Sequence, residues 1–369
     1  MFDLPADNLS PMGRTFIVAA SVLFVFSADL RAQPANTTDR SWELQYPRAI
    51  VNLIYGRFAW KSSPVLIRPS HGDNDTIRGI KEPTAVYFQN KWHLFATARS
   101  EKPTHQIVYL SFDDWNQADK STRHILKLDP NHSASPQVFY FEPQRKWYLI
   151  YQIEDPKKNP TIQPAFSTSD DISNPTSWTA PKPLFETQPD NIRLWTDFWV
   201  LCTDRRDYPL QERAYLFFSS REGKLWRCQT ALGDFPSKWS RPQSCLESDV
   251  LQGARVYRLR GYRKYLTIIE AQETGRRFCK AFWADFPNGR WDDLAVSEKR
   301  SFASRLNIKQ DPQWIEQISR GEILRTSYDQ RLEIDPLHIQ FLFAGIDEYD
   351  KTDRGYGQIP WRIGLLEPQ

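Results

Sequence analysis

The segment 79–97, GIKEPTAVYFQNKWHLFAT, predicts a β-hairpin. Two short runs of aromatic and β-branched residues are joined at Gln89-Asn90-Lys91, where asparagine tolerates the left-handed turn position. Glu82 stands just before the first run, and the proline that follows it disfavours helix at residue 82. A carboxylate at the mouth of a strand is either simply solvated or part of a site. Because the hairpin recurs along the chain, the second interpretation gains weight.

The hairpin pattern occurs four more times. Its later copies pair residues 136–141 with 146–149, 198–201 with 214–217, 255–258 with 264–267, and 322–325 with 330–334. Each of the first four hairpins leads into a third strand, a polar turn and then a tryptophan, namely Trp115, Trp178, Trp239 and Trp291, at intervals of 63, 61 and 52 residues. Such a period is typical of radial β blades. We therefore predict an all-β, five-bladed β-propeller, with a long-looped β-sandwich as the alternative, and we expect the tryptophans to pack between blades.

Composition and charge exclude some classes of partner. The chain has 369 residues, of which 40% are hydrophobic and 25% charged, as in an ordinary soluble globular protein. Its net charge is only +3 and the two signs are interspersed, so neither nucleic acid nor an anionic membrane surface is indicated. The 14 Trp, 15 Tyr and 22 Phe supply flat apolar faces, which pack cores and also suit sugar rings. We expect a monomer without a nucleic-acid or membrane partner.

The amino terminus has the pattern of an export signal. Residues 16–26 form an apolar run that follows Arg14, and it is too short to span a bilayer but fits the core of a signal peptide. We predict a signal peptide over residues 1–32, with Met12 as a possible start, then a linker over 33–45 and the propeller over 46–369. The protein is thus expected to be secreted or periplasmic.

Several classes of site are excluded by their motifs. The sequence has no G-x-S-x-G elbow, P-loop, Rossmann fingerprint or H-E-x-x-H, and its six histidines are scattered. Cys202, Cys228, Cys245 and Cys279 lack the C-x-x-C spacing of a structural zinc site. They fit either disulfides or free thiols.

Three residues precede the first strands of their blades and are expected to meet near the propeller axis: Glu82, Asp197 and Gln252. Acid–base cleavage of a glycosidic bond needs two carboxyl groups in opposite protonation states. Glu82 and Asp197 have the required chemistry. The amide of Gln252 can form hydrogen bonds but has no proton to transfer.

At these residues the chain resembles the α-L-arabinofuranosidases of glycoside hydrolase family 62, from about Phe58 to Leu366. The segments that carry the resemblance are IKEP at 80–83, KWHLFAT at 91–97, VYLSFDDW at 108–115, PQVFYF at 136–141, KWYLIYQ at 146–152, DDISNP at 170–175, DFWV at 197–200 and PWRIGLL at 360–366. The resemblance implies a five-bladed propeller that removes arabinofuranosyl side chains from xylan or arabinoxylan with inversion. It also implies an Asp base in a Lys-Asp-Pro motif, a Glu acid, and a second Asp that orients the substrate.

Carried over by position, the base is Glu82, the second Asp is Asp197 and the acid falls on Gln252. Lys81, Trp361 and Arg362 match positions near the family's sugar pocket. Two of the three catalytic positions depart from the pattern. Glutamate in place of aspartate moves the base by one methylene, on the order of 1.5 Å, and glutamine in place of glutamate removes the acid.

The resemblance also concerns a metal. The family's central calcium is supported by a histidine in an Ile-Ser-His-Gly motif, whereas Ile318-Ser319-Arg320-Gly321 puts a cation there. We therefore expect no bound metal, and a central calcium is the alternative.

Two functions remain open. The first is an inverting arabinofuranosidase, for which Glu270 is a possible but more plausibly structural replacement for the missing acid. The second is a catalytically impaired paralogue that binds polysaccharide.

Overall fold

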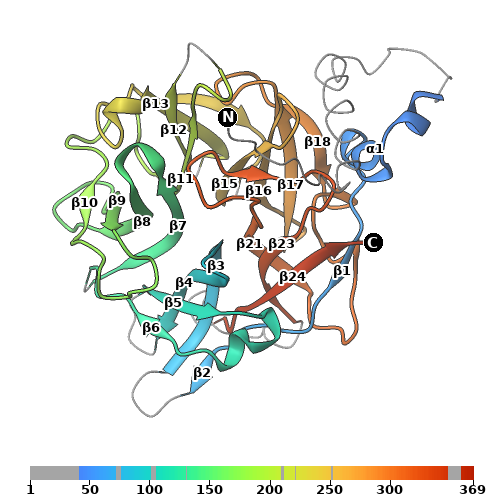
Figure 1. Ribbon diagram of the computed structural model, residues 1–369, viewed down its shortest axis with the longest axis horizontal. Coiled ribbons are helices and arrows are strands. Elements are labelled where there is room, and N and C mark those ends of the chain that lie inside the picture. Colours follow the sequence, from blue (N-terminus) through green and yellow to red (C-terminus); the bar gives the residue numbers. More distant parts are fainter. Residues whose placement is uncertain are drawn as a thin grey trace, which may run out of the picture. The chain divides into compact units, whose positions relative to one another are not determined.

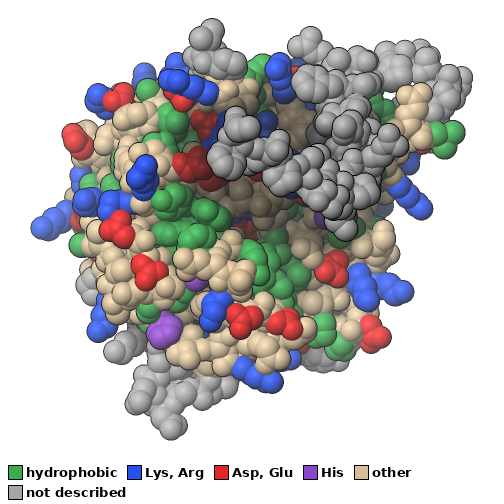
Figure 2. All heavy atoms as spheres, viewed as in Figure 1, with side chains coloured by type: hydrophobic (Ala, Val, Ile, Leu, Met, Phe, Trp, Pro, Cys, Tyr) green, Lys and Arg blue, Asp and Glu red, His purple; other side chains and the backbone are tan. Residues whose placement is uncertain are grey.

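The structure, a computed structural model, describes residues 41–71, 76–100, 105–129, 131–208, 212–220, 222–250, 252–347 and 359–369. The predicted signal peptide and most of the predicted linker lie outside these residues. Within them, five β-sheets are arranged around a common axis (Figure 1), which confirms the predicted five-bladed propeller. On the face drawn in Figure 2, acidic and basic side chains are interspersed, as the sequence indicated.

The chain builds four blades in sequence order. Blade I contains β2 (Ser70–His71), β3 (Thr76–Phe88), β4 (Lys91–Ser100), β5 (His105–Phe112) and β6 (His124–Ile125); blade II contains β7 (Ser133–Phe141), β8 (Lys146–Glu154), β9 (Ile162–Ser169) and β10 (Lys182–Pro183); blade III contains β11 (Thr196–Thr203), β12 (Arg213–Ser220), β13 (Lys224–Ala231) and β14 (Gln243–Glu247); blade IV contains β15 (Gln252–Leu259), β16 (Tyr265–Glu273), β17 (Arg276–Ala284), β18 (Asp292–Ser297), β19 (Arg300–Ser301) and β22 (Glu333–Ile334). The innermost strands of these four blades are β3, β7, β11 and β15, and buried apolar residues of neighbouring blades pack together in one core cluster.

Blade V joins the two ends of the described chain. It contains β21 (Gln317–Ile323), β23 (Phe341–Ile346) and β24 (Arg362–Pro368), completed by β1 (Trp60–Ser62) and β20 (Ile308–Lys309). Strand β1 pairs antiparallel with β24, with Trp60 opposite Pro368. Because strands from both ends share one sheet, the ring is closed by backbone hydrogen bonds.

The expected β-rich region begins with helix. Residues before β1 form the short 3-10 helix η1 (Ser41–Gln45) and α1 (Arg48–Ile54), whose Ile50, Val51 and Leu53 are buried. Three further 3-10 turns, η2 (Trp115–Lys120), η3 (Glu142–Gln144) and η4 (Leu232–Asp234), lie between strands. In the part of the chain that the structure describes, no helix is long and apolar enough to span a membrane.

The predicted fifth hairpin is wrong. Strand β21 pairs with β23, and the run at 330–334 instead contributes β22, which pairs parallel with β15 of blade IV. A short apolar run shows that a strand is present but does not show which neighbour it pairs with.

Three of the four marker tryptophans pack against the preceding blade. Ring centroids are 5.6 Å apart for Trp178 and Phe95, 6.4 Å for Trp239 and Phe185, and 6.3 Å for Trp291 and Phe217. Trp115 instead contacts Trp92 and Phe112 of its own blade, at 5.0 and 4.9 Å. The expected packing between blades is therefore confirmed for three of these residues.

All four cysteines are free thiols, and Cys202, Cys228 and Cys279 are buried. Burial raises the pKa of the Cys228 and Cys245 thiols to about 12. These thiols therefore pack as small apolar groups, and the disulfide alternative is excluded.

One segment crosses the axis at the carboxyl ends of the innermost strands. We call residues 326–334 the crossing segment. Its backbone carbonyls at Tyr328, Gln330 and Leu332 accept hydrogen bonds from the amides of Tyr140, Cys202 and Arg258, at 2.8, 2.8 and 3.2 Å. It thus ties blades II, III and IV together at this end.

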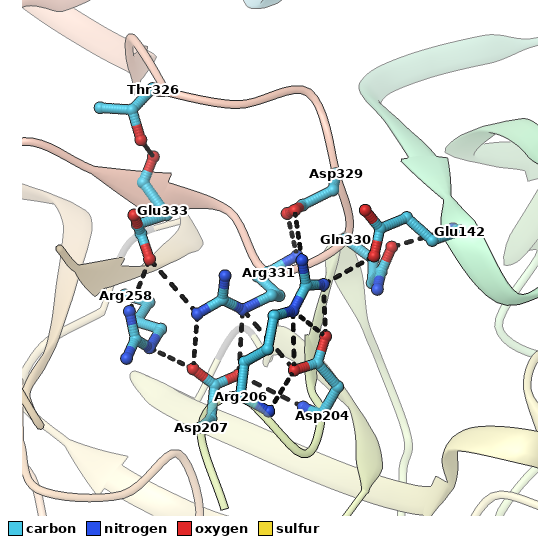
Figure 3. A network of polar contacts seen from close by, with 10 residues as sticks. All are labelled: Glu142, Asp204, Arg206, Asp207, Arg258, Thr326, Asp329, Gln330, Arg331 and Glu333. Atoms are coloured by element: carbon cyan, nitrogen blue, oxygen red, sulfur yellow. Dashed lines mark hydrogen bonds and ion pairs between the residues drawn. The ribbon is translucent and has the colours of Figure 1, made fainter. Parts of the chain in front are cut away.

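Ion pairs reinforce the crossing segment (Figure 3). Arg331 Nη2 lies 2.9 Å from Asp207 Oδ1, and Arg258 contacts both Asp207 and Glu333. Arg206 extends the network to Glu142, with 2.6 Å between Nη2 and Oε2. This end of the axis is thus closed by paired charges.

Candidate active site

The innermost strand of every blade contains a β-bulge near the other end of the axis. The pairing register shifts between Lys81 and Thr84, Ala134 and Gln137, Thr196 and Trp199, Gln252 and Ala254, and Ser319 and Gly321. A bulge re-aims a side chain that would otherwise alternate with the pleat. The residues released are Glu82, Ser135, Asp197, Gly253 and Arg320, which we call the axial ring.

Four ring members adopt left-handed backbone conformations. The φ angles are 56° at Glu82, 54° at Ser135, 64° at Asp197 and 51° at Gly253. Positive φ is uncommon outside glycine, and each such residue costs on the order of 1–3 kcal/mol. Glycine adopts such a conformation at little cost, so the strained members are Glu82, Ser135 and Asp197, and strained residues of this kind cluster at functional sites.

Both carboxylate oxygens of Glu82 have hydrogen-bond or ion-pair partners, and the residue is only 1% exposed. Its Oε2 accepts hydrogen bonds from Thr97 Oγ1 at 2.6 Å and from the amide of Ser135 at 3.0 Å. Its Oε1 lies 3.0 Å from Lys81 Nζ and contacts the Arg320 guanidinium. Burial opposes ionisation, but Arg320, Lys81 and the Thr97 hydrogen bond outweigh it and hold the pKa of Glu82 well below its usual range.

Asp197 shares partners with Glu82. Ser135 Oγ lies 2.9 Å from Glu82 Oε2 and 3.0 Å from Asp197 Oδ1, and its single proton can be donated to only one of them at a time. Arg320 contacts Asp197 through Nη1 and Glu82 through Nη2. The buried Oδ2 of Asp197 has no hydrogen-bond partner among the described residues. Glu82 and Asp197 therefore meet on the axis, and both side chains are buried.

Gln252 lies one residue before the ring. It stays in the ladder opposite Glu270, and the bulge position of blade IV is occupied by Gly253. A Cβ at residue 253 would lie 2.8 Å from Cδ of Arg320 and 3.4 Å from Cβ of Asp197. The missing side chain is therefore what gives Arg320 its place. The buried Oε1 of Gln252 has no hydrogen-bond partner among the described residues.

Glu270 has the environment of a structural carboxylate. It is 1% exposed, and its Oε1 contacts Arg277. Its Oε2 accepts hydrogen bonds from Ser319 Oγ and from the amide of Arg320, both at 2.9 Å. Both oxygens of Glu270 are thus engaged by partners within the protein.

Of the other three residues predicted for the sugar pocket, one lies in strand β3, one lies beside it and the third pairs with Asp347. Lys81 is buried beside Glu82. Trp361 is also buried near this strand, since its carbonyl accepts a hydrogen bond of 3.0 Å from the amide of Ile80. Arg362 instead pairs with Asp347, with 3.2 Å between Nη1 and Oδ2.

Ser135, Gly253 and Arg320 were not predicted as ring members. A signal for Ser135 was present, because Ser135-Pro136 in the second hairpin matches Glu82-Pro83 in the first. Arg320 was predicted as a cation near a metal position, although its partners were not. The bulge at Gly253 leaves no mark that separates it from Gln252 in the sequence.

A calcium ion on the axis does not fit the residues present. The Arg320 guanidinium already contacts the two ring carboxylates. Deeper in the core, Arg255 is 2% exposed and stacks 4.4 Å above the Trp199 ring, and Arg325 Nε lies 2.6 Å from Glu322 Oε1. Among the described residues no group of three or more His, Cys, Asp or Glu side chains is placed to hold a metal. Three buried guanidinium groups would repel a divalent cation.

The fold and the ring carboxylates place the protein in the class of propeller glycoside hydrolases. The chain belongs to glycosyl hydrolase family 62, whose sequence model matches residues 59–367.

Individual relatives agree with this assignment. The chain is 33% identical over 317 residues to alpha-L-arabinofuranosidase C of Cellvibrio japonicus (strain Ueda107), covering 83% of this chain and 46% of the relative, so it spans about half of that protein's length. It is 34% identical to the catalytic domain of a GH62 alpha-L-arabinofuranosidase from Coprinopsis cinerea, with a TM-score of 0.77, covering 85% of this chain and 97% of that one. A GH62 hydrolase solved in complex with xylotriose is 33% identical, with a TM-score of 0.77, covering 85% and 99% of the two chains.

Proposed function

We propose that the protein is an α-L-arabinofuranosidase-type hydrolase that removes arabinofuranosyl side chains from xylan or arabinoxylan with inversion. Family membership and the activities named for the relatives support this proposal. The observation that carries it within the chain is the meeting of Glu82 and Asp197 on the axial ring, where Glu82 is held ionised. A general base must be ionised to accept a proton.

In the proposed reaction Glu82 takes a proton from the attacking water, and Asp197 orients the furanose. Inversion requires the water to attack from the face opposite the departing oxygen. Lys81 keeps Glu82 anionic while the water is positioned.

The departing oxygen has no evident proton source at the predicted position. Gln252 and Gly253 carry no transferable proton, and both oxygens of Glu270 are engaged. We therefore expect cleavage to depend strongly on the leaving group, because an aryl furanoside departs with little protonation and a polysaccharide linkage does not.

Comparing two substrates tests this function. Wild-type protein should release the aryl group from an aryl α-L-arabinofuranoside far faster than it releases arabinose from arabinoxylan. Gln252→Glu should raise the rate on arabinoxylan selectively, by the ~10²–10⁴-fold of one general acid. Gln272→Glu, which adds the same charge at an exposed position on the next strand, is the matched control. Ordinary rates on arabinoxylan by wild type would show that another residue supplies the proton.

A second function, polysaccharide binding without hydrolysis, is favoured by one observation. Each oxygen of Glu82 already has a charged or hydroxyl partner, which weakens it as a base. This function is supported if neither substrate reacts, even in a Gln252→Glu, Glu82→Asp double variant that restores both residue types, while xylan is still retained in an affinity gel.

We also propose that the protein works outside the cytoplasm as a monomer, since its proposed substrate is an extracellular polymer. Terminal sequencing of the exported protein should begin at Gln33, and light scattering should give the mass of one chain. An uncleaved amino terminus in the exported fraction contradicts the signal-peptide prediction.

A further inference from the structure

Ser135 connects the two ring carboxylates through a single hydroxyl group. Its Oγ lies 2.9 Å from Glu82 Oε2 and 3.0 Å from Asp197 Oδ1. Arg320 Nη1 donates to the same oxygen at 3.4 Å, and a guanidinium group has no acceptor to offer in return. The hydroxyl proton of Ser135 therefore points to one of the two carboxylates.

The backbone of Ser135 is fixed, so the hydroxyl proton can change its partner while the residue stays in place. Ser135 is buried, and its amide donates to Glu82 Oε2 at 3.0 Å and to Thr97 Oγ1 at 2.8 Å. A serine hydroxyl rotates to suit its acceptor. Rotation about the Cβ–Oγ bond thus transfers the hydrogen bond from Glu82 to Asp197 without moving a heavy atom of the ring.

The partner of this hydroxyl should depend on the charge of Glu82. A hydrogen bond donated to a carboxylate favours the ionised form over the neutral form. While Glu82 is ionised, donation to its Oε2 stabilises the anion. Once Glu82 has taken up a proton it is the weaker acceptor, because hydrogen bonds to charged groups are the stronger ones, and Asp197 becomes the better partner.

We propose that Ser135 is a positioning residue for the proposed reaction: its hydroxyl donates to Glu82 while Glu82 is the anionic base, and turns to Asp197 when Glu82 takes a proton from water. The inference rests on the proposed function, in which Glu82 is that base. Ser135 acts through the two carboxylates and exchanges no proton of its own, so the proton lost by the water stays on Glu82.

Charged and titratable groups from every blade face Glu82 and affect its titration. They are Lys81, His105, His132, Asp197, Arg255 and Arg320. The lysine and the arginines stay protonated in acid. Burial lowers the pKa of both imidazoles, that of His105 to about 3. A test therefore needs a probe that is specific for Glu82.

Carbon-13 NMR of glutamate side-chain carboxyl groups follows the titration of Glu82 without requiring catalysis. The resonance is assigned by its absence in Glu82→Gln. In Ser135→Ala the titration midpoint should rise by about one pH unit, because the ionised form loses one hydrogen bond. Ser135→Gly removes the same hydroxyl and also relieves the backbone at φ of 54°. An equal rise in this variant shows that backbone strain is not the cause.

Ser167→Ala is the matched control. Ser167 is a buried serine of the same blade, on β9, and its hydroxyl is bonded to Tyr151 with 2.8 Å between the two oxygens. Its removal should leave the titration midpoint of Glu82 unchanged.

Asp197→Asn distinguishes a shared hydroxyl from one that serves Glu82 alone. Loss of the Asp197 charge should lower the Glu82 midpoint in any background, since a nearby anion opposes ionisation. With Ser135 present the midpoint should fall further, because the neutral amide is a poorer acceptor and leaves the hydroxyl on Glu82. Equal effects of Asp197→Asn in wild type and in Ser135→Ala overturn the proposal. So does a Glu82 midpoint that both Ser135 variants leave unchanged, or a Glu82 that stays ionised in both until acid unfolds them.

The outcome is separate from that of the proposed hydrolysis. In an active enzyme the acid limb of kcat/KM for an aryl α-L-arabinofuranoside should rise in Ser135→Ala together with the NMR midpoint. If wild type releases no aryl group while the NMR shifts occur, the coupling through Ser135 is supported and the hydrolase is not. If wild type hydrolyses this substrate while both Ser135 variants keep the wild-type midpoint, the hydrolase is supported and the role of Ser135 is not.

Discussion

Arg320 determines how the two ring carboxylates are held. A guanidinium is a rigid fork whose two terminal nitrogens can serve two acceptors at once, and here Nη1 contacts Asp197 while Nη2 contacts Glu82. Lysine would offer one point charge on a flexible stem. The two acidic side chains can therefore lie side by side, because a fixed cation lies between them.

Removing this cation should destabilise the protein in a pH-dependent way. Arg320→Gln should cost about 3–5 kcal/mol at pH 7, since it leaves buried carboxylates uncompensated. The lowered pKa of Glu82 contributes stability that is present above the unfolded value of about 4.3 and is lost as pH falls through the folded pKa. In the variant the folded pKa rises, so that contribution should shrink or change sign, and the stability gap should narrow towards pH 4.

Thermal unfolding between pH 4 and pH 8 measures this effect. The control is Arg241→Gln, since Arg241 and Asp190 form a pair whose side chains are 70% and 82% exposed. It should change stability by less than about 1 kcal/mol at any pH. A gap for Arg320→Gln that stays constant with pH would contradict the assignment of Glu82 as the affected group.

We expect glycine to be needed at residue 253 mainly because a Cβ there would clash with the Arg320 side chain. The positive φ of the residue should matter less. Gly253→Ala places a Cβ 2.8 Å from Arg320 Cδ, at a residue with φ of 51°. Gly261→Ala, at φ of 82° with no atom within 4 Å of the added Cβ, carries the backbone strain alone. We expect Gly253→Ala to cost about 1–3 kcal/mol more than Gly261→Ala in urea unfolding. Equal costs would mean that Arg320 moves aside freely.

At the scale of elements, the bulge and the crossing segment have opposite roles on the same innermost strands. The bulges break pairing where side chains must face the axis, whereas the crossing segment adds pairing at the strands' carboxyl ends. A propeller blade contacts mainly its neighbours, so a segment bonded to three blades couples them directly.

Among the ion pairs that hold the crossing segment, those of Asp207 should contribute most to the stability of the protein. Its side chain is 1% exposed and meets both Arg331 and Arg258. Asp207→Asn should cost about 1.5–3 kcal/mol, because it removes one of the two carboxylates, Asp207 and Glu333, that Arg258 and Arg331 share. Asp170→Asn, in a pair with Lys146 whose side chains are 79% and 41% exposed, should cost less than about 1 kcal/mol.

Amide hydrogen exchange would show which part of the molecule loses protection in the Asp207→Asn variant. In Asp207→Asn the amides of Tyr140 and Cys202, which bond to the crossing segment, should lose protection before those at the axial ring. Uniform loss of protection across the molecule would show that the crossing segment is not a separate unit of stability.

For the molecule as a whole, the repeats in the sequence predicted the five-bladed architecture. The position of one bulge and the partner of one strand could not be predicted from it. Glu82 and Asp197 were found because each precedes a recognisable strand. Gln252 lies one residue before the ring member Gly253, because a bulge adds a residue without changing the apolar pattern, so the sequence does not show at which residue the bulge falls. The run at 330–334 was recognised as a strand, but its partner β15 is more than 70 residues away in the chain, and nothing local specifies such pairing.

Three buried arginines supply positive charge at the core of the propeller, where a metal ion would otherwise be needed to balance the buried carboxylates. Arg320, Arg255 and Arg325 supply fixed cations at the core, so we expect stability to be independent of divalent metal. Neither a millimolar chelator nor millimolar calcium should shift the thermal midpoint of the full chain by more than about 1 °C. A calcium ion bound only by the folded state would instead stabilise it by about 2.7 kcal/mol at a concentration one hundred times its Kd, which is several degrees for a chain of this size. Arg320→His, which replaces the guanidinium by an imidazole that can bind a metal, is the comparison in which added calcium should raise the thermal midpoint if a metal site can form on the axis. If wild type loses stability in chelator, a metal site exists beside these arginines and the assignment of Arg320 as the central cation is wrong.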